Sequence, residues 1–147
     1  MNIEILTRTD FHYFLNIGTR WADNFFFGHV NNVVYYSFFD TAVNTFLIQH
    51  AGLDIHAGDT IGLVVDSGCS YFAPLAYPEQ IVAGVRVLKL GNSSVRYQIA
   101  LFKENEHSAA AQGHFVHVYI ARESRRPQPL PDAMRQALAV LTVTNPH

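Results

Sequence analysis

Hydrophobic and polar residues alternate along most of the second half of the chain, and this period of two predicts β-strands. The same alternation occurs near the start, over about residues 12–21. Between the later segments, short stretches rich in Gly, Asn, Ser, Glu or Pro interrupt the pattern and predict turns. The later strands are predicted over Gly62–Phe72, Val82–Leu90, Val95–Phe102 and Ala109–Ile120.

One segment follows a helical period instead. It extends from Val33 to about His50, and Gly52 predicts its end. Its polar residues fall on one narrow stripe and apolar residues cover most of the rest, so other elements must enclose the helix. A short second helix is predicted over Asp132–Leu141, after a proline-rich stretch. The stripe consists of Ser37, Asp40, Thr41 and Asn44.

The order of elements is one strand, one long apolar helix and four further strands. This order predicts an α+β fold in a single domain over residues 1–147. Hairpin turns between the later strands predict an antiparallel sheet, which can enclose the helix only by curling around it. Five strands still leave an unpaired edge and an uncovered outer face. We therefore expect a second copy of the chain to cover them, most simply in a twofold dimer.

Composition and charge narrow the possible functions. Charged residues make up 15% of the chain, against about 25% in a typical globular domain, which agrees with surface buried against another copy. A net charge of −2 provides no basic excess for binding nucleic acid. The single cysteine fits a reducing compartment, and no apolar run has the length of a membrane span. We therefore expect a cytoplasmic protein.

The segment before the long helix is the best candidate for chemistry. Gly28 breaks the chain there, and Asn31 or Asn32 is suited to cap the helix. The first N–H groups of a helix carry partial positive charge, so they can stabilise an anion or the oxyanion that develops on a polarised carbonyl. Many helices begin after a glycine for structural reasons alone, and that alternative stays open on this pattern.

Several short motifs stand in order along residues 12–131. They are Arg20-Trp21-Ala22-Asp23, Gly28-His29-Val30-Asn31-Asn32, Tyr36, Tyr71-Phe72-Ala73-Pro74-Leu75, Ser94-Val95-Arg96-Tyr97, Gly113-His114-Phe115-Val116-His117-Val118 and Arg125-Arg126-Pro127. Together they resemble the motifs of hot-dog fold acyl-CoA thioesterases of the 4-hydroxybenzoyl-CoA thioesterase type. The resemblance implies a curved antiparallel sheet around one long helix, in a dimer or a tetramer. It also implies hydrolysis of acyl-CoA to a free acid and CoA, without a cofactor.

One position departs from the family pattern. Members commonly carry a second aspartate two residues after the first, and its carboxylate acts as nucleophile or as base for water. Here the first aspartate is Asp23, but the second position holds Phe25, which cannot perform acid–base or nucleophilic chemistry. His29, Asp23 or Asp40 would have to replace the missing group. The ordinary pKa of histidine, about 6.5, suits a base near neutrality.

Phe25 leaves three alternatives open. Hydrolysis uses another group, or the protein binds acyl-CoA without cleaving it, or the substitution is sporadic in an active lineage. A hot-dog dehydratase is a further alternative, which requires a histidine and a helix carboxylate across the dimer. The motif from Gly28 to Asn32 argues against that alternative.

The resemblance implies that the thioester carbonyl lies at the start of the long helix, near Asn31, Asn32 and Val33. The acyl chain would then run between helix and sheet, along Phe25, Phe27 and Tyr36 and a neighbouring subunit. The catalytic candidates are Asp23, His29 and Asn32. The phosphates of CoA require cations, and the candidates are Lys89, Arg96, Arg122, Arg125 and Arg126.

These candidates also have simpler structural interpretations. Asp23 could pair with Arg20, Tyr36 could belong to the core, and the arginines could form a solvated turn. No metal site is expected. His114 and His117 are three residues apart on a predicted strand and so point to opposite faces, and the chain offers only one cysteine.

Overall fold

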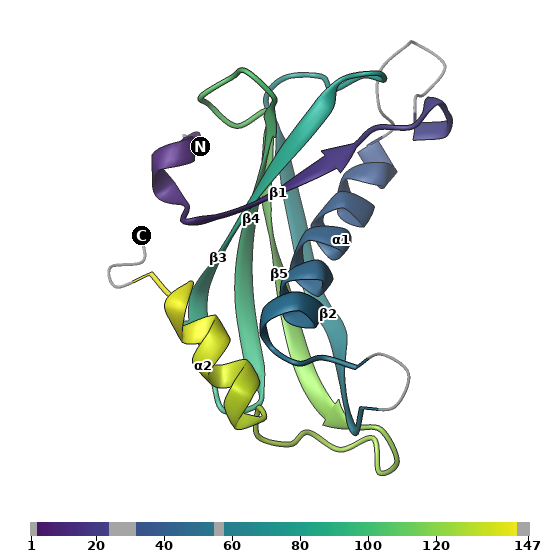
Figure 1. The fold of residues 1–147 in the computed structure, drawn as a ribbon, viewed down its shortest axis with the longest axis vertical. Helices are drawn as coiled ribbons and strands as arrows, with labels where there is room; N and C mark the ends of the chain where they lie inside the picture. The colour runs from purple at the N-terminus through teal and green to yellow at the C-terminus, as the bar shows by residue number, and fades with distance from the viewer. Residues whose placement is uncertain (1–2, 24–31, 55–57, 144–147) are drawn as a thin grey trace.

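In the part of the chain that the structure describes, five strands form one antiparallel sheet and the long helix α1 lies across its inner face (Figure 1). This computed structural model describes residues 3–23, 32–54 and 58–143. The order of the strands in the sheet is β1-β3-β4-β5-β2. The elements are β1 (Tyr13–Gly18), α1 (Asn32–His50), β2 (Thr60–Tyr71), β3 (Gln80–Leu90), β4 (Ser94–Lys103), β5 (Ala111–Ala121), α2 (Asp132–Val140) and the short 3-10 helices η1 (Arg8–Asp10) and η2 (Trp21–Asp23).

The predicted α+β architecture and the predicted order of helices and strands are confirmed. One expectation is corrected, because hairpins join β3 to β4 and β4 to β5 but not β2 to β3. Residues 72–79 carry the chain from β2, at one edge, to β3 on the far side of β5 and β4. This segment contains Pro74 and Pro78, which lack the N–H that a strand ladder requires. The strand order leaves β2 at an edge of the sheet.

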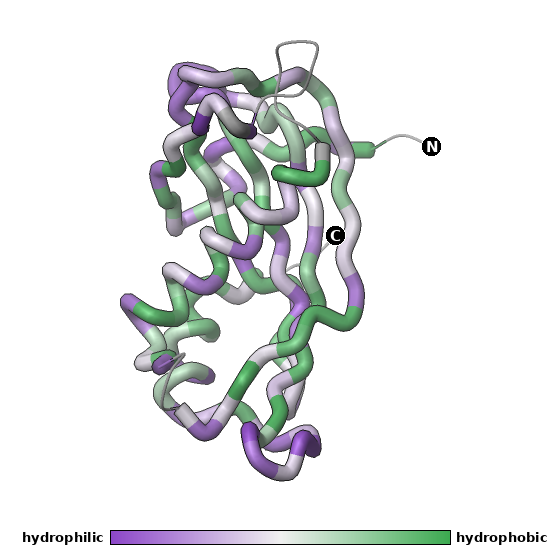
Figure 2. Tube along the Cα trace, turned by 90° about the vertical axis from the view of Figure 1, so that its right-hand side faces the viewer, coloured by the Kyte–Doolittle hydropathy of each residue, from purple (hydrophilic) through white to green (hydrophobic). Residues whose placement is uncertain are grey.

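The main core lies between α1 and the inner face of the sheet. Phe39, Val43 and Leu47 of α1 are buried, whereas Ser37 and Asp40 of the predicted polar stripe are exposed. The alternation of hydrophobic and hydrophilic residues along the strands is visible in Figure 2. The sheet contributes a row of buried side chains to this core, namely Ile81, Val85, Val87, Val95, Tyr97, Ile99, Leu101, Phe115 and Tyr119.

Gly113 of β5 allows α1 to sit close to the sheet. A Cβ atom at this position would lie 2.6 Å from the ring of Phe39 and would overlap the backbone oxygen of Gly68. Because real Cβ atoms do not approach other atoms so closely, a larger residue would force the helix or β2 to move. The glycine therefore fixes the distance between α1 and β5.

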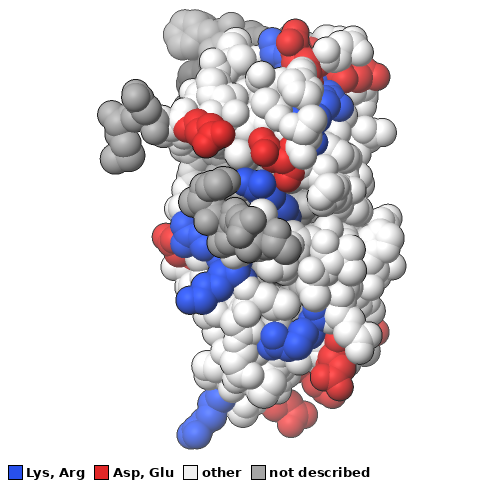
Figure 3. Space-filling view, turned by 90° about the vertical axis from the view of Figure 1, so that its left-hand side faces the viewer, with Lys and Arg blue, Asp and Glu red and all other residues white. Residues whose placement is uncertain are grey.

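The N-terminal segment covers part of the outer face of the sheet. Leu6 and Phe11 are buried there against Val82 and Phe102. Phe11 lies directly over Gly84, where a Cβ atom would come within 2.7 Å of its ring. The surface shown in Figure 3 carries interspersed acidic and basic side chains on a largely uncharged background, as expected from the low charge content.

The two edges of the sheet differ. On one side, β1 covers β3 up to Val85, and the chain after α2 continues the cover through two backbone hydrogen bonds at Val87. On the other side, β2 has no partner beyond β5 among the described residues. Leu63, Val64 and Val65 of this edge are 45%, 48% and 59% exposed. An apolar strand edge of this kind is suited to pairing with another chain.

A β-bulge interrupts β2. The pairing with β5 shifts by one residue between Val64 and Asp66. Val64 lies opposite His117, but after the bulge Asp66 lies opposite Val116, whose side chain is on the outer face. There the Asp66 carboxylate is 2.9 Å from the Nε2 atom of His114.

We expect Gly113→Ala to lower the free energy of unfolding by about 1–3 kcal/mol, because the new methyl group overpacks the seam between α1 and β5. Gly18→Ala is the matched control, since the nearest atom to its Cβ is 3.8 Å away, and its effect should stay within about 0.5 kcal/mol. Urea unfolding followed by circular dichroism measures both. Equal stabilities for the two variants would contradict the close contact at Gly113.

Candidate active site

Asp23 holds the chain just before the segment that leads to α1. Its Oδ2 accepts a hydrogen bond of 2.8 Å from the backbone N–H of Arg20, and its Oδ1 accepts bonds of 3.2 and 2.8 Å from the Arg20 guanidinium. The carboxylate is only 1% exposed. The alternative in which Asp23 pairs with Arg20 is therefore what the structure shows. Since both oxygens are engaged, this carboxylate positions the chain.

The segment that leads into the helix contains several of the predicted residues. Phe25, Phe27, His29 and Asn31 lie outside the described residues, as does the side chain of Asn32. The helix itself begins at Asn32, the last residue of the Gly28 motif and one residue before the predicted start at Val33. Val33 in its first turn is 75% exposed.

Tyr36 extends an aromatic row that links α1 to β5. Its ring stacks on Phe115 at a centroid distance of 6.3 Å and an interplanar angle of 4°. Phe115 in turn lies 5.7 Å from the His117 ring, at 27°. Tyr36 is half-buried, so it lines the seam between helix and sheet and also reaches its surface. Tyr36 thus packs against the core, the simpler interpretation given above for this residue.

A buried polar group that the sequence did not reveal lies at the inner end of this row. The hydroxyls of Tyr97 and Tyr119 are 2.7 Å apart, and the Tyr119 hydroxyl is 3.3 Å from Nδ1 of His117. Burial lowers the pKa of His117 to about 4 and raises the pKa of Tyr119 to about 12, so the imidazole is neutral at pH 7. His117 and Tyr119 follow Phe115 at steps of two residues on a strand, so all three side chains lie on the same face of the sheet. This spacing could have indicated the group from the sequence.

The structure also places Cys69 and the two histidines of β5. Burial raises the pKa of the Cys69 thiol to about 11, which disfavours the thiolate that would attack a thioester. Across the described ranges, no three His, Cys, Asp or Glu side chains converge as metal ligands. His114 and His117 lie on opposite faces of β5, as predicted, since His114 pairs with Asp66 on the outer side.

The five predicted cations gather at one end of the sheet, and we call them the basic cluster (Lys89, Arg96, Arg122, Arg125 and Arg126). Lys89 and Arg96 are cross-strand neighbours. The three arginines follow the end of β5, where Arg122 donates a 2.7 Å hydrogen bond to the Gly58 carbonyl. The start of α1 lies at the opposite end of the molecule (Figure 1). Within one chain, the structure does not bring the basic cluster to the helix start.

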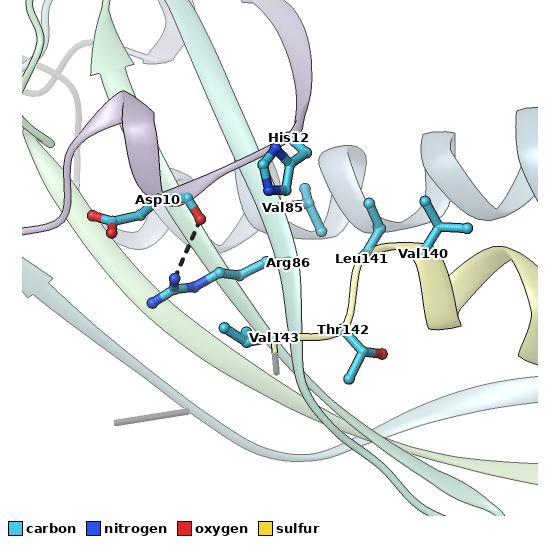
Figure 4. Close-up of a pocket in the computed structure, with 8 residues that line it drawn as sticks. All are labelled: Asp10, His12, Val85, Arg86, Val140, Leu141, Thr142 and Val143. Atoms are coloured by element: carbon cyan, nitrogen blue, oxygen red, sulfur yellow. Dashed lines mark hydrogen bonds between the residues drawn. The ribbon is translucent and has the colours of Figure 1, made fainter. Parts of the chain in front are cut away.

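Two surface hollows lined by described residues lie away from the start of α1. One of about 230 Å³ sits at the β3 edge, between the start of β1 and the chain after α2, and Figure 4 shows Arg86 and His12 in its wall. Arg86 is held there by bonds to the Asp10 carbonyl (3.2 Å) and to Gln98 (2.6 Å). Another, of about 270 Å³, crosses the outer face beside His114. No helix in the described ranges is long and apolar enough to cross a membrane.

Comparison with known proteins gives a consistent result. A family model for the thioesterase-like superfamily matches residues 17–138. The crystal structure of the PA5185 protein from Pseudomonas aeruginosa strain PAO1 is 54% identical, with a TM-score of 0.94 over 96% of this chain and 99% of that chain.

Two other solved structures are thioesterases. A thioesterase from Thermus thermophilus, solved with coenzyme A and Zn, is 32% identical, with a TM-score of 0.70 over 87% of this chain and 92% of that one. A 1,4-dihydroxy-2-naphthoyl-CoA thioesterase from Synechocystis is 19% identical and shares the fold, with a TM-score of 0.78 over 88% of this chain and 96% of that one. Among curated proteins there is no match.

We expect the stability of the protein to fall as the pH drops from about 6.5 towards 4. In this window the unfolded chain binds a proton at His117, whereas the folded chain, with a pKa of about 4 at this residue, does not. The free energy of unfolding is therefore highest above pH 6.5. In His117→Phe, the difference between pH 7 and pH 5 should shrink.

The control is Val95→Ala, which removes buried volume from the cross-strand neighbour of His117 without removing a titratable group. It should lower stability equally at both pH values. Urea unfolding at pH 7 and pH 5 gives the comparison. An unchanged pH dependence in His117→Phe would contradict a histidine that stays neutral in the folded state.

Proposed function

The chain belongs to the thioesterase-like superfamily, and we propose on this basis that it hydrolyses an acyl-CoA thioester to a free acid and coenzyme A. Membership confirms the resemblance to hot-dog fold thioesterases that the motifs indicated. The observation that carries the proposal is the helix start at the last residue of the Gly28 motif, within a match that covers most of the chain. The 32% identical thioesterase solved with coenzyme A supports the substrate class.

The proposed reaction begins with the thioester carbonyl at the start of α1. The positive end of the helix dipole stabilises the oxyanion that forms when water adds to the carbonyl carbon. The base takes one proton from this water. The C–S bond then breaks, the thiolate of coenzyme A takes up that proton, and the acid leaves with the oxygen of the water. The chain supplies the polarising helix and the base.

We assign the base to His29. Phe25 occupies the position of the usual carboxylate, and both oxygens of Asp23 are engaged by Arg20. Asp40 lies two helical turns beyond the start of α1, where it accepts a 2.9 Å hydrogen bond from Asn44. Asp23 then acts as a positioning residue that fixes the chain entering the site, and Asn32 marks the end of the helix where the carbonyl lies.

The acyl group is proposed to enter between α1 and the sheet. Tyr36 stands at the surface end of the seam and stacks on Phe115, which leads towards the core. Phe25 and Phe27 provide further apolar wall before the helix in this proposal. A hydrophobic acyl group fits such surroundings better than a charged one.

A twofold dimer brings the basic cluster to the site. If two chains pair antiparallel along β2, the Thr60 end of one strand lies beside the Tyr71 end of the other. Tyr71 lies next to the first turns of α1, since its ring is 4.9 Å from that of Tyr35, and the basic cluster lies at the Thr60 end. The phosphates of CoA would then contact the basic cluster of one chain while the thioester reaches the other chain's helix.

A non-catalytic acyl-CoA-binding protein is the second candidate function. Phe25 favours it, because the side chain at this position cannot activate water. The two functions differ in one measurable property: the enzyme releases thiol, whereas the binding protein is stabilised by CoA thioesters without releasing it.

We expect the unmodified protein to release thiol from acyl-CoA, and His29→Ala to lower kcat by about 100-fold or more, the usual contribution of a general base. Thiol release from short, long and aromatic acyl-CoAs measures this. His107→Ala, which changes an exposed histidine outside the site, is the control and should keep full activity.

Phe25→Asp separates the alternatives. Activity only in this variant would favour the binding protein over the enzyme. Full activity in His29→Ala would contradict His29 as the base. No activity in any variant, together with no thermal stabilisation by CoA thioesters, would contradict both candidate functions.

We expect Val65→Lys to dissociate the dimer, because it places charges on the apolar β2 edge. Val140→Lys is the matched control, since Val140 is 77% exposed on α2, away from that edge. Sedimentation velocity gives the oligomeric state. The KM for acyl-CoA should rise with dissociation, since the basic cluster then leaves the site. A dimer that persists in Val65→Lys would place the interface elsewhere.

A further inference from the structure

One buried polar atom in the core has no partner. The Nε2 atom of His117 makes no hydrogen bond among the described residues, although the residue is only 3% exposed. Its Nδ1 atom is used by Tyr119, so the ring is held in place. An unsatisfied polar atom in the interior is costly and uncommon, and it often marks the position of a group that binds there.

The hydrogen-bond chain determines what Nε2 offers. If Tyr97 donates to Tyr119 and Tyr119 donates to Nδ1 of His117, both phenol hydrogens are used. The neutral imidazole then carries its hydrogen on Nε2. The reverse direction would leave the buried Tyr97 hydroxyl without an acceptor among the described residues. In the favoured arrangement, the Nε2–H of His117 is therefore a buried hydrogen-bond donor without an acceptor among the described residues.

The position of this donor agrees with the proposed path of the acyl group. Aromatic rings fill the seam between α1 and β5. In this row Tyr36 lies at the surface end, its ring is 6.3 Å from that of Phe115, and the His117 ring is a further 5.7 Å along. An acyl chain of medium length that enters beside Tyr36 spans this depth.

We propose that His117 is a specificity-determining residue, whose Nε2–H donates a hydrogen bond to a neutral oxygen in the distal half of the acyl group. The inference rests on the proposed function and names the class of substrate: an acyl-CoA that carries a ketone, hydroxyl or ether oxygen. A carboxylate at this position is disfavoured, because a neutral imidazole in an apolar core would not compensate its charge. Tyr119 is a positioning residue that selects the Nε2–H tautomer.

The test compares decanoyl-CoA with a series of oxodecanoyl-CoAs in which the ketone moves along the second half of the chain. We expect kcat/KM to be on the order of tenfold higher for one ketone position, as one satisfied hydrogen bond provides. His117→Leu should abolish this preference, so that the ratio of kcat/KM for the ketone substrate to kcat/KM for decanoyl-CoA falls to about one. His117→Gln, which keeps an N–H donor, should retain part of it. His114→Leu, on the opposite face of β5, should retain all of it.

Tyr119→Phe supplies a second, milder variant if His117→Leu fails to fold. It should reduce the preference for the ketone, because Nδ1 then loses the hydroxyl that donates to it. Nitrogen NMR of the imidazole gives an independent readout, in which the unmodified protein should show the Nε2–H tautomer. An Nδ1–H tautomer would overturn the proposal.

Three further outcomes overturn it. The first is equal kcat/KM for all substrates in the unmodified protein, and the second is a ketone preference that survives in His117→Leu. If no thioester is hydrolysed, the proposed function fails separately, and calorimetry with uncleavable thioether analogues of the same acyl-CoAs then tests His117 alone. If the ketone and alkyl thioethers bind with equal affinity, the proposal is overturned by this third outcome, and a trapped water is then the partner of Nε2 of His117.

Discussion

The structure depends on the need to enclose a helix that is apolar over most of its surface. α1 has 19 residues, and only a narrow stripe around Ser37 and Asp40 faces outwards. One sheet must therefore supply nearly all of its cover, which requires the strands to curve around it. The two edges of this curved sheet are covered to different extents. On one side β1 and the chain after α2 pair with β3, and on the other side β2 is the edge strand with apolar side chains exposed.

Enclosure also determines where a substrate can reach the interior. Small and branched side chains of β3 fill the space beneath the helix on one side, whereas aromatic rings fill the seam between α1 and β5. Rings that stack edge to face or face to face provide a continuous apolar surface from Tyr36 inwards. At the end of this surface the core contains three polar groups in place of hydrocarbon. Such a combination discriminates between ligands in a way that an entirely apolar core cannot.

Much of the fold could be predicted from the sequence, because periodicity reports directly on which faces are buried. The long helix, its polar stripe and the strands all followed from that signal. The crossing from β2 to β3 did not, since strand order depends on tertiary contacts between distant segments. The pairing of Asp23 with Arg20 was foreseen as an alternative to catalysis. The group formed by Tyr97, His117 and Tyr119 was missed, because a tyrosine or histidine in an alternating strand is equally compatible with either face until the sheet is assembled.

The bulge in β2 determines which side chains of this strand face the core. Before the bulge, even-numbered residues such as Val64 face inwards; after it, odd-numbered residues such as Ser67 do. Loss of a single residue from this strand would therefore turn the Asp66 carboxylate from its partner His114 towards the apolar interior. The one extra residue at the bulge therefore keeps an ionisable side chain out of the core while the rest of β2 keeps its pairing with β5.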